Sequence, residues 1–152
     1  MCLIVDANVA TLVFSPPPHA DFKPVAEALR AKTATAVYGG QLVDEYEKLS
    51  SLTRIIRELD RQGILRLQSH AKVEAMTRSV KDEGLCVSDD QHIIALARVA
   101  DVRLLCSGDK NLHRDFTNPA ILKPRGDIYQ KASHAHLIAK HCSKAKKARS
   151  KR

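Results

Sequence analysis

The sequence contains no tryptophan, and only 4% of its 152 residues are aromatic. A single domain of this length needs a sizeable core, so that core must be built mostly from aliphatic side chains. The scarcity of rings also argues against the stacking platforms with which single-strand binding proteins hold successive bases.

Long apolar runs are missing as well. No run approaches the roughly 18 residues that a membrane-spanning helix requires. Asp6 interrupts the first apolar stretch after Val5, which is unlike the apolar segment of a secretory signal. We therefore expect no membrane span and a cytoplasmic location.

The cysteines form no recognisable framework. The four of them, at positions 2, 86, 106 and 142, include no Cys-x-x-Cys pair, which is the spacing typical of metal or redox sites. This distribution favours reduced cysteines in a cytoplasmic protein. Cys106 lies in an apolar run, which predicts a buried, reduced side chain.

Positive charge is concentrated at the end of the chain. The net charge is +8, yet residues 144–152 hold six basic residues and no acid, so the rest is only mildly basic. We expect residues 1–141 to form one domain and residues 142–152 to form a basic, disordered tail. Such a tail serves either as a nucleic-acid-binding arm or as a solubilising end.

Strand-like and helix-like segments alternate along the chain. Apolar or β-branched runs predict strands at 3–5, 33–38, 64–67, 103–106 and, briefly, 121–122. Periodicity and breakers predict helices at about 8–14, 21–31, 42–49, 52–61, 70–81, 88–100, 110–116 and 128–141. The alternation predicts an α/β fold whose central, mainly parallel sheet has helices on both faces. Ser88 and Gln91, spaced as a capping box, give the fullest helix-start signal.

Two acids follow strands that should end at the same edge of the sheet. Asp6 directly follows strand 3–5, and Asp109 follows strand 103–106 after a Ser-Gly turn. Right-handed crossovers bring strand ends of one polarity to one edge, where open α/β sheets bind their ligands. Each acid could instead cap the helix that follows it.

Two further acids lie on inward-facing helical stripes. Asp90 shares its stripe with Ile93 and Ile94, and Glu45 shares one with Leu42 and Leu49. The alternatives are that Asp90 only complements a helix dipole and that Glu45 is an ordinary surface acid. Asp89 is a less favoured candidate than Asp90, because Asp90 precedes the apolar stripe by three and four residues.

Four converging carboxylates repel one another unless they take up protons or a cation neutralises them. Oxygen ligands favour Mg²⁺ or Mn²⁺. A pair of such ions can stabilise the attacking and leaving oxygens of a phosphodiester. The pattern therefore indicates metal-dependent chemistry on a polyanion.

The order of these motifs over about residues 1–125 resembles the PIN-domain ribonucleases. The matching segments are Leu3–Asn8, Glu45 within 42–49, Asp90 before Ile93–Ala97, and Ser107-Gly108-Asp109-Lys110. The resemblance implies a Rossmann-like three-layer α/β/α sandwich and a Mg²⁺- or Mn²⁺-dependent ribonuclease. By the same resemblance Asp6, Glu45, Asp90 and Asp109 are the metal-binding, catalytic acids.

The resemblance also implies supporting roles for Asn8 and Ser107, a homodimer and often a small antitoxin partner, so the chain could be the toxin of a toxin–antitoxin pair. Asn111 stands where relatives often carry a further acid. Either Asp115, one helical turn later, supplies that weaker ligand or no residue does.

Basic residues and a histidine flank the expected site. Arg98, Lys110 and Arg114 are candidate contacts for RNA phosphates, with solvated helix charges as the alternative. His92 lies near the acids in the sequence and could contact substrate, but we expect it at the surface. Two rival functions remain: a non-catalytic PIN-like module that binds RNA through the basic tail, and a phosphoacceptor receiver domain. The receiver is disfavoured because Asp6 is not part of an acidic pair.

Overall fold

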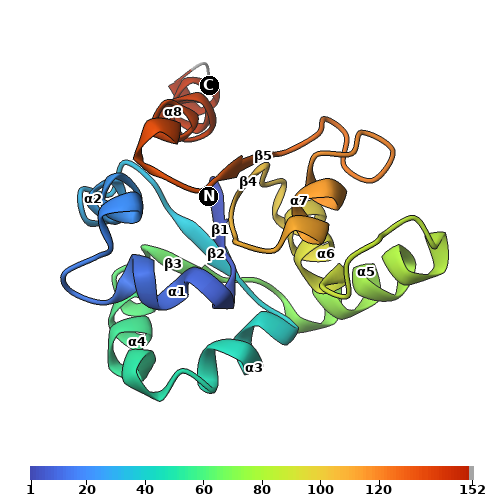
Figure 1. Ribbon diagram of the computed structural model, residues 1–152, viewed down its shortest axis with the longest axis horizontal. Coiled ribbons are helices and arrows are strands. Elements are labelled where there is room, and N and C mark those ends of the chain that lie inside the picture. The colour runs from blue at the N-terminus through green and yellow to red at the C-terminus, as the bar shows by residue number, and fades with distance from the viewer. Residues whose placement is uncertain (151–152) are drawn as a thin grey trace.

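The computed structural model describes residues 1–150, with side chains through residue 143. Over this range the chain forms a Rossmann-like three-layer α/β/α sandwich around a five-stranded sheet (Figure 1). The strands are β1 (Leu3–Val5), β2 (Ala36–Tyr38), β3 (Leu65–Leu67), β4 (Leu104–Cys106) and β5 (Asp127–Tyr129). Their order is β3-β2-β1-β4-β5, and all four neighbouring pairs are parallel. The predicted fold class is confirmed.

Helices connect and cover the strands. They are α1 (Ala7–Phe14), α2 (Lys23–Arg30), α3 (Gln41–Glu47), α4 (Thr53–Arg61), α5 (His70–Glu83), α6 (Gln91–Ala100), α7 (Lys110–Phe116) and α8 (His136–Ser150). Short 3₁₀ turns occupy Ala20–Phe22, Ser50–Leu52 and Ala132–His134. In Figure 1, α1, α2 and α4 lie on one side of the strands, and α5, α6 and α7 lie on the other.

The order of the central strands determines where the predicted acids lie. β1 lies between β2 and β4, with Ile4 opposite Val37 on one side and Leu105 on the other. All residues of these three strands are buried and most are aliphatic, because a strand covered on both faces needs continuous apolar sequence. The chain crosses to β2 on one side of β1 and returns to β4 on the other. The carboxyl ends of β1 and β4 therefore meet at a switch point, where such sheets form a crevice.

Three predicted elements were wrong. The helix predicted from Ser88 begins at Gln91. The helix predicted for 128–141 begins only at His136, because residues 127–129 pair with β4 as a fifth strand. Residues 121–122 form no strand: both are buried in a turn and donate their backbone N–H groups to the Asn118 carbonyl, each at 2.9 Å.

A disulfide joins the two ends of the domain. Cys2, just before β1, pairs with Cys142 on α8, 140 positions away. The prediction that all cysteines are reduced was wrong for this pair, since nothing in the spacing indicates a contact that only the topology creates. Cys86 and Cys106 are free, and Cys106 is buried as predicted.

The segment expected to be a basic tail, 142–152, lies partly on α8, which continues to Ser150. Its basic side chains, at positions 144–152, lie outside the described part of the structure. None of the helices in the described range is both long and apolar enough to cross a bilayer.

Candidate metal-binding site

Asp6 begins the site at the end of β1. It is 4% exposed, and its backbone N–H donates to the Cys106 carbonyl at 2.9 Å. Ser107 Oγ donates to Asp6 Oδ2 at 2.8 Å, which fixes the carboxylate across the junction of β1 and β4. The Asp6 side chain makes no capping hydrogen bond to α1. Its carboxylate is held by Ser107 and does not cap α1.

A tight glycine turn brings Glu45 to the same edge. Gly40 adopts φ +55°, and a Cβ there would lie 2.6 Å from Cγ1 of Val73. Only glycine tolerates both conditions, so α3 can begin directly after β2. Tyr46 Oη then donates to the Val5 carbonyl, which anchors α3 beside the end of β1.

Asp115 positions the loop that carries Asp90. Its two carboxylate oxygens accept the backbone N–H groups of Val87 and Ser88, each at 2.9 Å. Ser88 Oγ in turn accepts the Asp90 N–H at 2.9 Å. These bonds explain why α6 starts later than the capping box predicts. They also leave the Asp90 carboxylate without a capping role, so it is available to the cluster.

Asp109 serves two purposes. Its Oδ1 accepts the N–H groups of Asn111 at 2.9 Å and Leu112 at 3.3 Å, and so caps α7. The same side chain lies near Asp90 and contributes to raising the pKa of that carboxyl group. Asp109 therefore caps α7 and also lies beside Asp90.

The supporting residues lie around these acids. Asn8 Oδ1 accepts the Gly108 N–H at 3.3 Å, and Ser107 Oγ accepts the Asp109 N–H at 3.1 Å. Together these contacts tie the start of α1 to the turn after β4. Asp89, the less favoured neighbour of Asp90, is exposed.

His92 is the candidate residue that sequence reasoning misplaced. The expectation of a surface histidine was wrong, because its side chain is 3% exposed and Nε2 lies 3.0 Å from Glu45 Oε1. Glu45, Asp90 and His92 each offer a ligand atom, and these atoms lie within 4.8 Å of one another. The available signal was position: His92 precedes the buried residues Ala95 and Leu96 by three and four, which indicates an inward-facing side chain.

The electrostatics of the cluster follow from burial and mutual repulsion. Desolvation, together with the charges of Asp6 and Glu45, raises the pKa of Asp90 to about 6. The pKa of Asp6 is also raised, chiefly by burial and further by Glu45, although the Ser107 hydrogen bond opposes the shift. The charges of Asp6, Glu45 and Asp90 thus act on one another, and Asp109 lies beside Asp90. The ligand atoms that lie within 4.8 Å of one another belong to Glu45, Asp90 and His92.

The predicted RNA contacts divide into two kinds. Arg98 donates to both carboxylate oxygens of Glu83, at 2.7 and 2.8 Å, and to the Ile121 carbonyl. Its guanidinium is therefore engaged within the protein. Lys110 and Arg114 are exposed on α7, whose first turn is capped by Asp109.

The donor set fits a small divalent cation. Carboxylate oxygens suit Mg²⁺ and Mn²⁺, and an imidazole nitrogen is a general ligand for transition metals. Within residues 1–143, the ion pairs of Lys and Arg involve none of the four clustered acids. A bound cation would supply the counter-charge that basic side chains do not.

Comparison of the chain with family models, with curated proteins and with solved structures found no match.

Proposed function

We propose that the protein is a Mg²⁺- or Mn²⁺-dependent ribonuclease of the PIN-domain type. One observation carries the proposal: Glu45 and Asp90 offer ligand atoms within 4.8 Å of each other and of His92, and Asp6 and Asp109 are near enough to affect the pKa of Asp90. Among the described side chains, no Lys or Arg is paired to any of these four acids. Such an arrangement costs free energy unless protons or a cation neutralise it. Proteins retain that cost mainly where function requires it.

Asp6, Glu45, Asp90 and Asp109 would hold the ion, with His92 as an additional ligand or as the partner that orients Glu45. When bound, Mg²⁺ or Mn²⁺ supplies a positive charge that stabilises the phosphodiester transition state and lowers the pKa of a coordinated water. The chain's own contribution is orientation. Ser107 fixes Asp6, and the backbone N–H groups at the start of α7 fix Asp109. Fixed ligands need no reorganisation during the reaction.

The substrate would approach along α7. Lys110 and Arg114 are exposed there and can meet phosphate oxygens. Arg98 is a weaker candidate for this role, because binding RNA would require it to leave Glu83.

RNA as the substrate follows from the resemblance of the four motifs to PIN-domain ribonucleases. The homodimer, the small antitoxin partner, the toxin role and the cytoplasmic location rest on sequence reasoning in the same way and stay predictions.

The proposal is tested by incubating end-labelled RNA of mixed sequence with the protein in Mn²⁺, in Mg²⁺ and in chelator. We expect cleavage that requires metal and falls at least about 100-fold in Asp90→Asn. Asp89→Asn is the matched control, since it removes the same charge from an exposed neighbour. Equal activity of Asp90→Asn and wild type, or cleavage that persists in chelator, would contradict the metal mechanism. RNA binding without cleavage in any metal would favour the non-catalytic module instead.

A further inference from the structure

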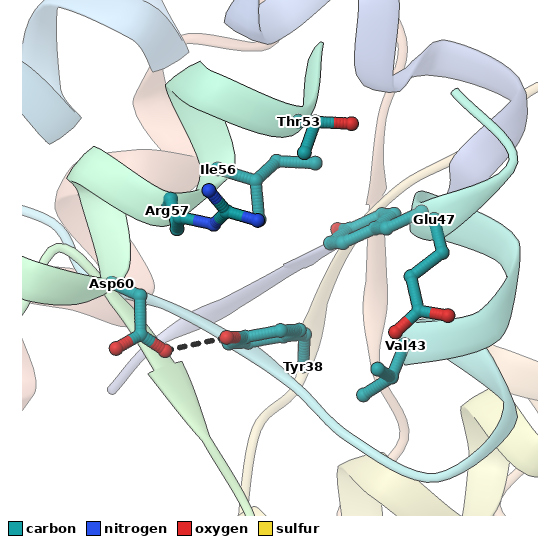
Figure 2. Close-up of a pocket in the computed structure, with 8 residues that line it drawn as sticks. Tyr38, Val43, Glu47, Thr53, Ile56, Arg57 and Asp60 are labelled. Atoms are coloured by element: carbon teal, nitrogen blue, oxygen red, sulfur yellow. Dashed lines mark hydrogen bonds between the residues drawn. The ribbon is translucent and has the colours of Figure 1, made fainter. Parts of the chain in front are cut away.

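A hollow lies between α3 and α4, apart from the residues of the acidic cluster. It encloses about 410 Å³ between the end of β2, α3 and α4, within the about 300–1,000 Å³ typical of small-molecule sites. Its lining residues are Tyr38, Val43, Tyr46, Glu47, Thr53, Ile56, Arg57 and Asp60. Figure 2 shows Tyr38 and Asp60 joined by a hydrogen bond, with Arg57 and Glu47 entering from α4 and α3.

Aromatic rings form part of the wall. Tyr38 and Tyr46 stack at a centroid distance of 5.9 Å and an interplanar angle of 21°. Their hydroxyl groups are already used, because Tyr38 donates to Asp60 and Tyr46 donates to the Val5 carbonyl. The rings are thus held in place and almost wholly covered, with Tyr38 9% and Tyr46 2% exposed. The half-buried side chains of Val43 and Ile56 supply the accessible apolar wall. Two of the chain's three tyrosines contribute to this one cavity.

The rim carries opposite charges that do not neutralise each other. Glu47 and Arg57 are both exposed, and within residues 1–143 neither forms an ion pair or a side-chain hydrogen bond. An acid and a base that border the same hollow without pairing remain available to a ligand. The complementary ligand presents hydrogen-bond donors on one edge and acceptors on another.

The hollow is adjacent to the proposed catalytic centre. Glu45 and Tyr46 are consecutive residues of α3, yet Glu45 contacts His92 in the cluster while Tyr46 lines the hollow. Tyr46 also bonds to Val5, the residue immediately before Asp6. A nucleic acid strand held at the cluster can therefore place a neighbouring base into the hollow.

We propose that this hollow binds one unpaired guanine base of the RNA substrate. Guanine alone among the bases combines two adjacent donors, N1–H and the N2 amino group, with two acceptors, O6 and N7. Glu47 can accept from the donors, and Arg57 can donate to O6 and N7, the commonest arginine–base contact. Val43 and Ile56, with the exposed edge of Tyr38, supply the apolar contact that unstacked bases require. This inference rests on the proposed function and assigns its base specificity.

The low aromatic content does not oppose a site of this kind. A platform for successive bases needs several rings along a strand, whereas a single base needs one sheltered position.

The first experiment measures binding without catalysis. Wild-type protein in chelator is titrated with GMP, AMP, CMP and UMP, and binding is followed by chemical-shift changes. We expect GMP to bind at least about fivefold more tightly than the other three, because the lower end of the range for a good bidentate contact corresponds to about that factor. Glu47→Gln and Arg57→Gln should each lose the preference. Arg54→Gln is the matched control, as an exposed arginine on α4 that does not line the hollow.

The outcomes separate the two proposals. Equal binding of all four nucleotides, or a preference that survives both substitutions, would overturn the guanine site. Sequencing the products of metal-dependent cleavage of random RNA supplies the second readout, with guanine enriched at a fixed offset from the cut. Cleavage without that enrichment would contradict the guanine site but not the nuclease proposal. GMP binding in a protein that cleaves no RNA would contradict the nuclease proposal but not the guanine site.

Discussion

His92 Nε2 lies 3.0 Å from Glu45 Oε1, and this contact joins the start of α6 to α3 beneath the acidic cluster. The histidine is buried and the glutamate is partly buried, so the pair lies at the inner wall of the site. Removing either partner leaves the other without its hydrogen bond in a region with little water.

We predict that His92→Gln weakens Mn²⁺ binding by about 10- to 100-fold, the range found when a residue that orients a metal ligand is lost. Isothermal titration calorimetry measures this directly. His136→Gln, an exposed histidine on α8, is the control and should bind Mn²⁺ like the wild type. Unchanged affinity in His92→Gln would restrict His92 to a packing role.

The crowded carboxylates make the metal-free protein sensitive to pH. The pKa of Asp90 is about 6 in the fold and 3.8 as the ordinary value, so the folded state binds more protons between these limits. Asp90 therefore contributes to the free energy of unfolding at low pH, and this contribution is lost as the pH rises through about 6. In chelator, the melting temperature of Asp90→Asn should rise relative to that of the wild type as the pH rises from 5 to 7.5. Parallel pH profiles for the two proteins would contradict the repulsion within the cluster.

Adding Mn²⁺ should reverse that trend. Metal binding requires ionised carboxylates, so the increase in melting temperature on adding Mn²⁺ should be larger at pH 7.5 than at pH 5. An equal increase at both values would indicate that the ion binds somewhere other than these acids.

Asp115 is expected to act on stability. It accepts two backbone N–H groups while 2% exposed, and an asparagine side chain offers only one acceptor oxygen. Asp115→Asn should lower the free energy of unfolding by about 1.5–3 kcal/mol, the typical contribution of a hydrogen bond to a charged group. Denaturant unfolding measures the change, with Asp89→Asn as the exposed control. Full stability with lost Mn²⁺ affinity would instead identify Asp115 as a ligand.

The Cys2–Cys142 disulfide closes a loop that spans nearly the whole domain. Constraining so long a loop contributes up to about 5 kcal/mol in the chain-entropy model. A reductant should therefore lower the melting temperature of the wild type, and Cys142→Ser should melt at the reduced value with or without reductant. Insensitivity of the wild type to reductant would contradict the pairing.

The positions predicted for the acids follow from general rules. Parallel strands bring Asp6 and Asp109 to one edge, and helical periodicity turns Glu45 and Asp90 inward. These rules use local pattern and sheet polarity alone. They therefore place the acids near one another without identifying the ion or the substrate.

The features that sequence reasoning missed depend on long-range contacts. The Ser88 capping box gave a false helix start because Asp115, 27 residues away, takes the Ser88 N–H. Strand β5 has little apolar pattern of its own and exists because it pairs with β4. Composition also concealed the aromatic hollow, since a count of three tyrosines does not say that two of them share one cavity.

Metal-dependent cleavage by Asp6→Asn tests the central claim most directly. Asparagine keeps the size of the side chain and its contact with Ser107 but removes the buried charge, so the variant should fold and melt at or above the wild-type temperature in chelator. We predict loss of Mn²⁺-dependent RNA cleavage by at least about 100-fold in a protein with an unchanged circular dichroism spectrum. A folded Asp6→Asn protein that cleaves RNA as fast as the wild type would contradict the assignment of the acidic cluster as the catalytic metal site.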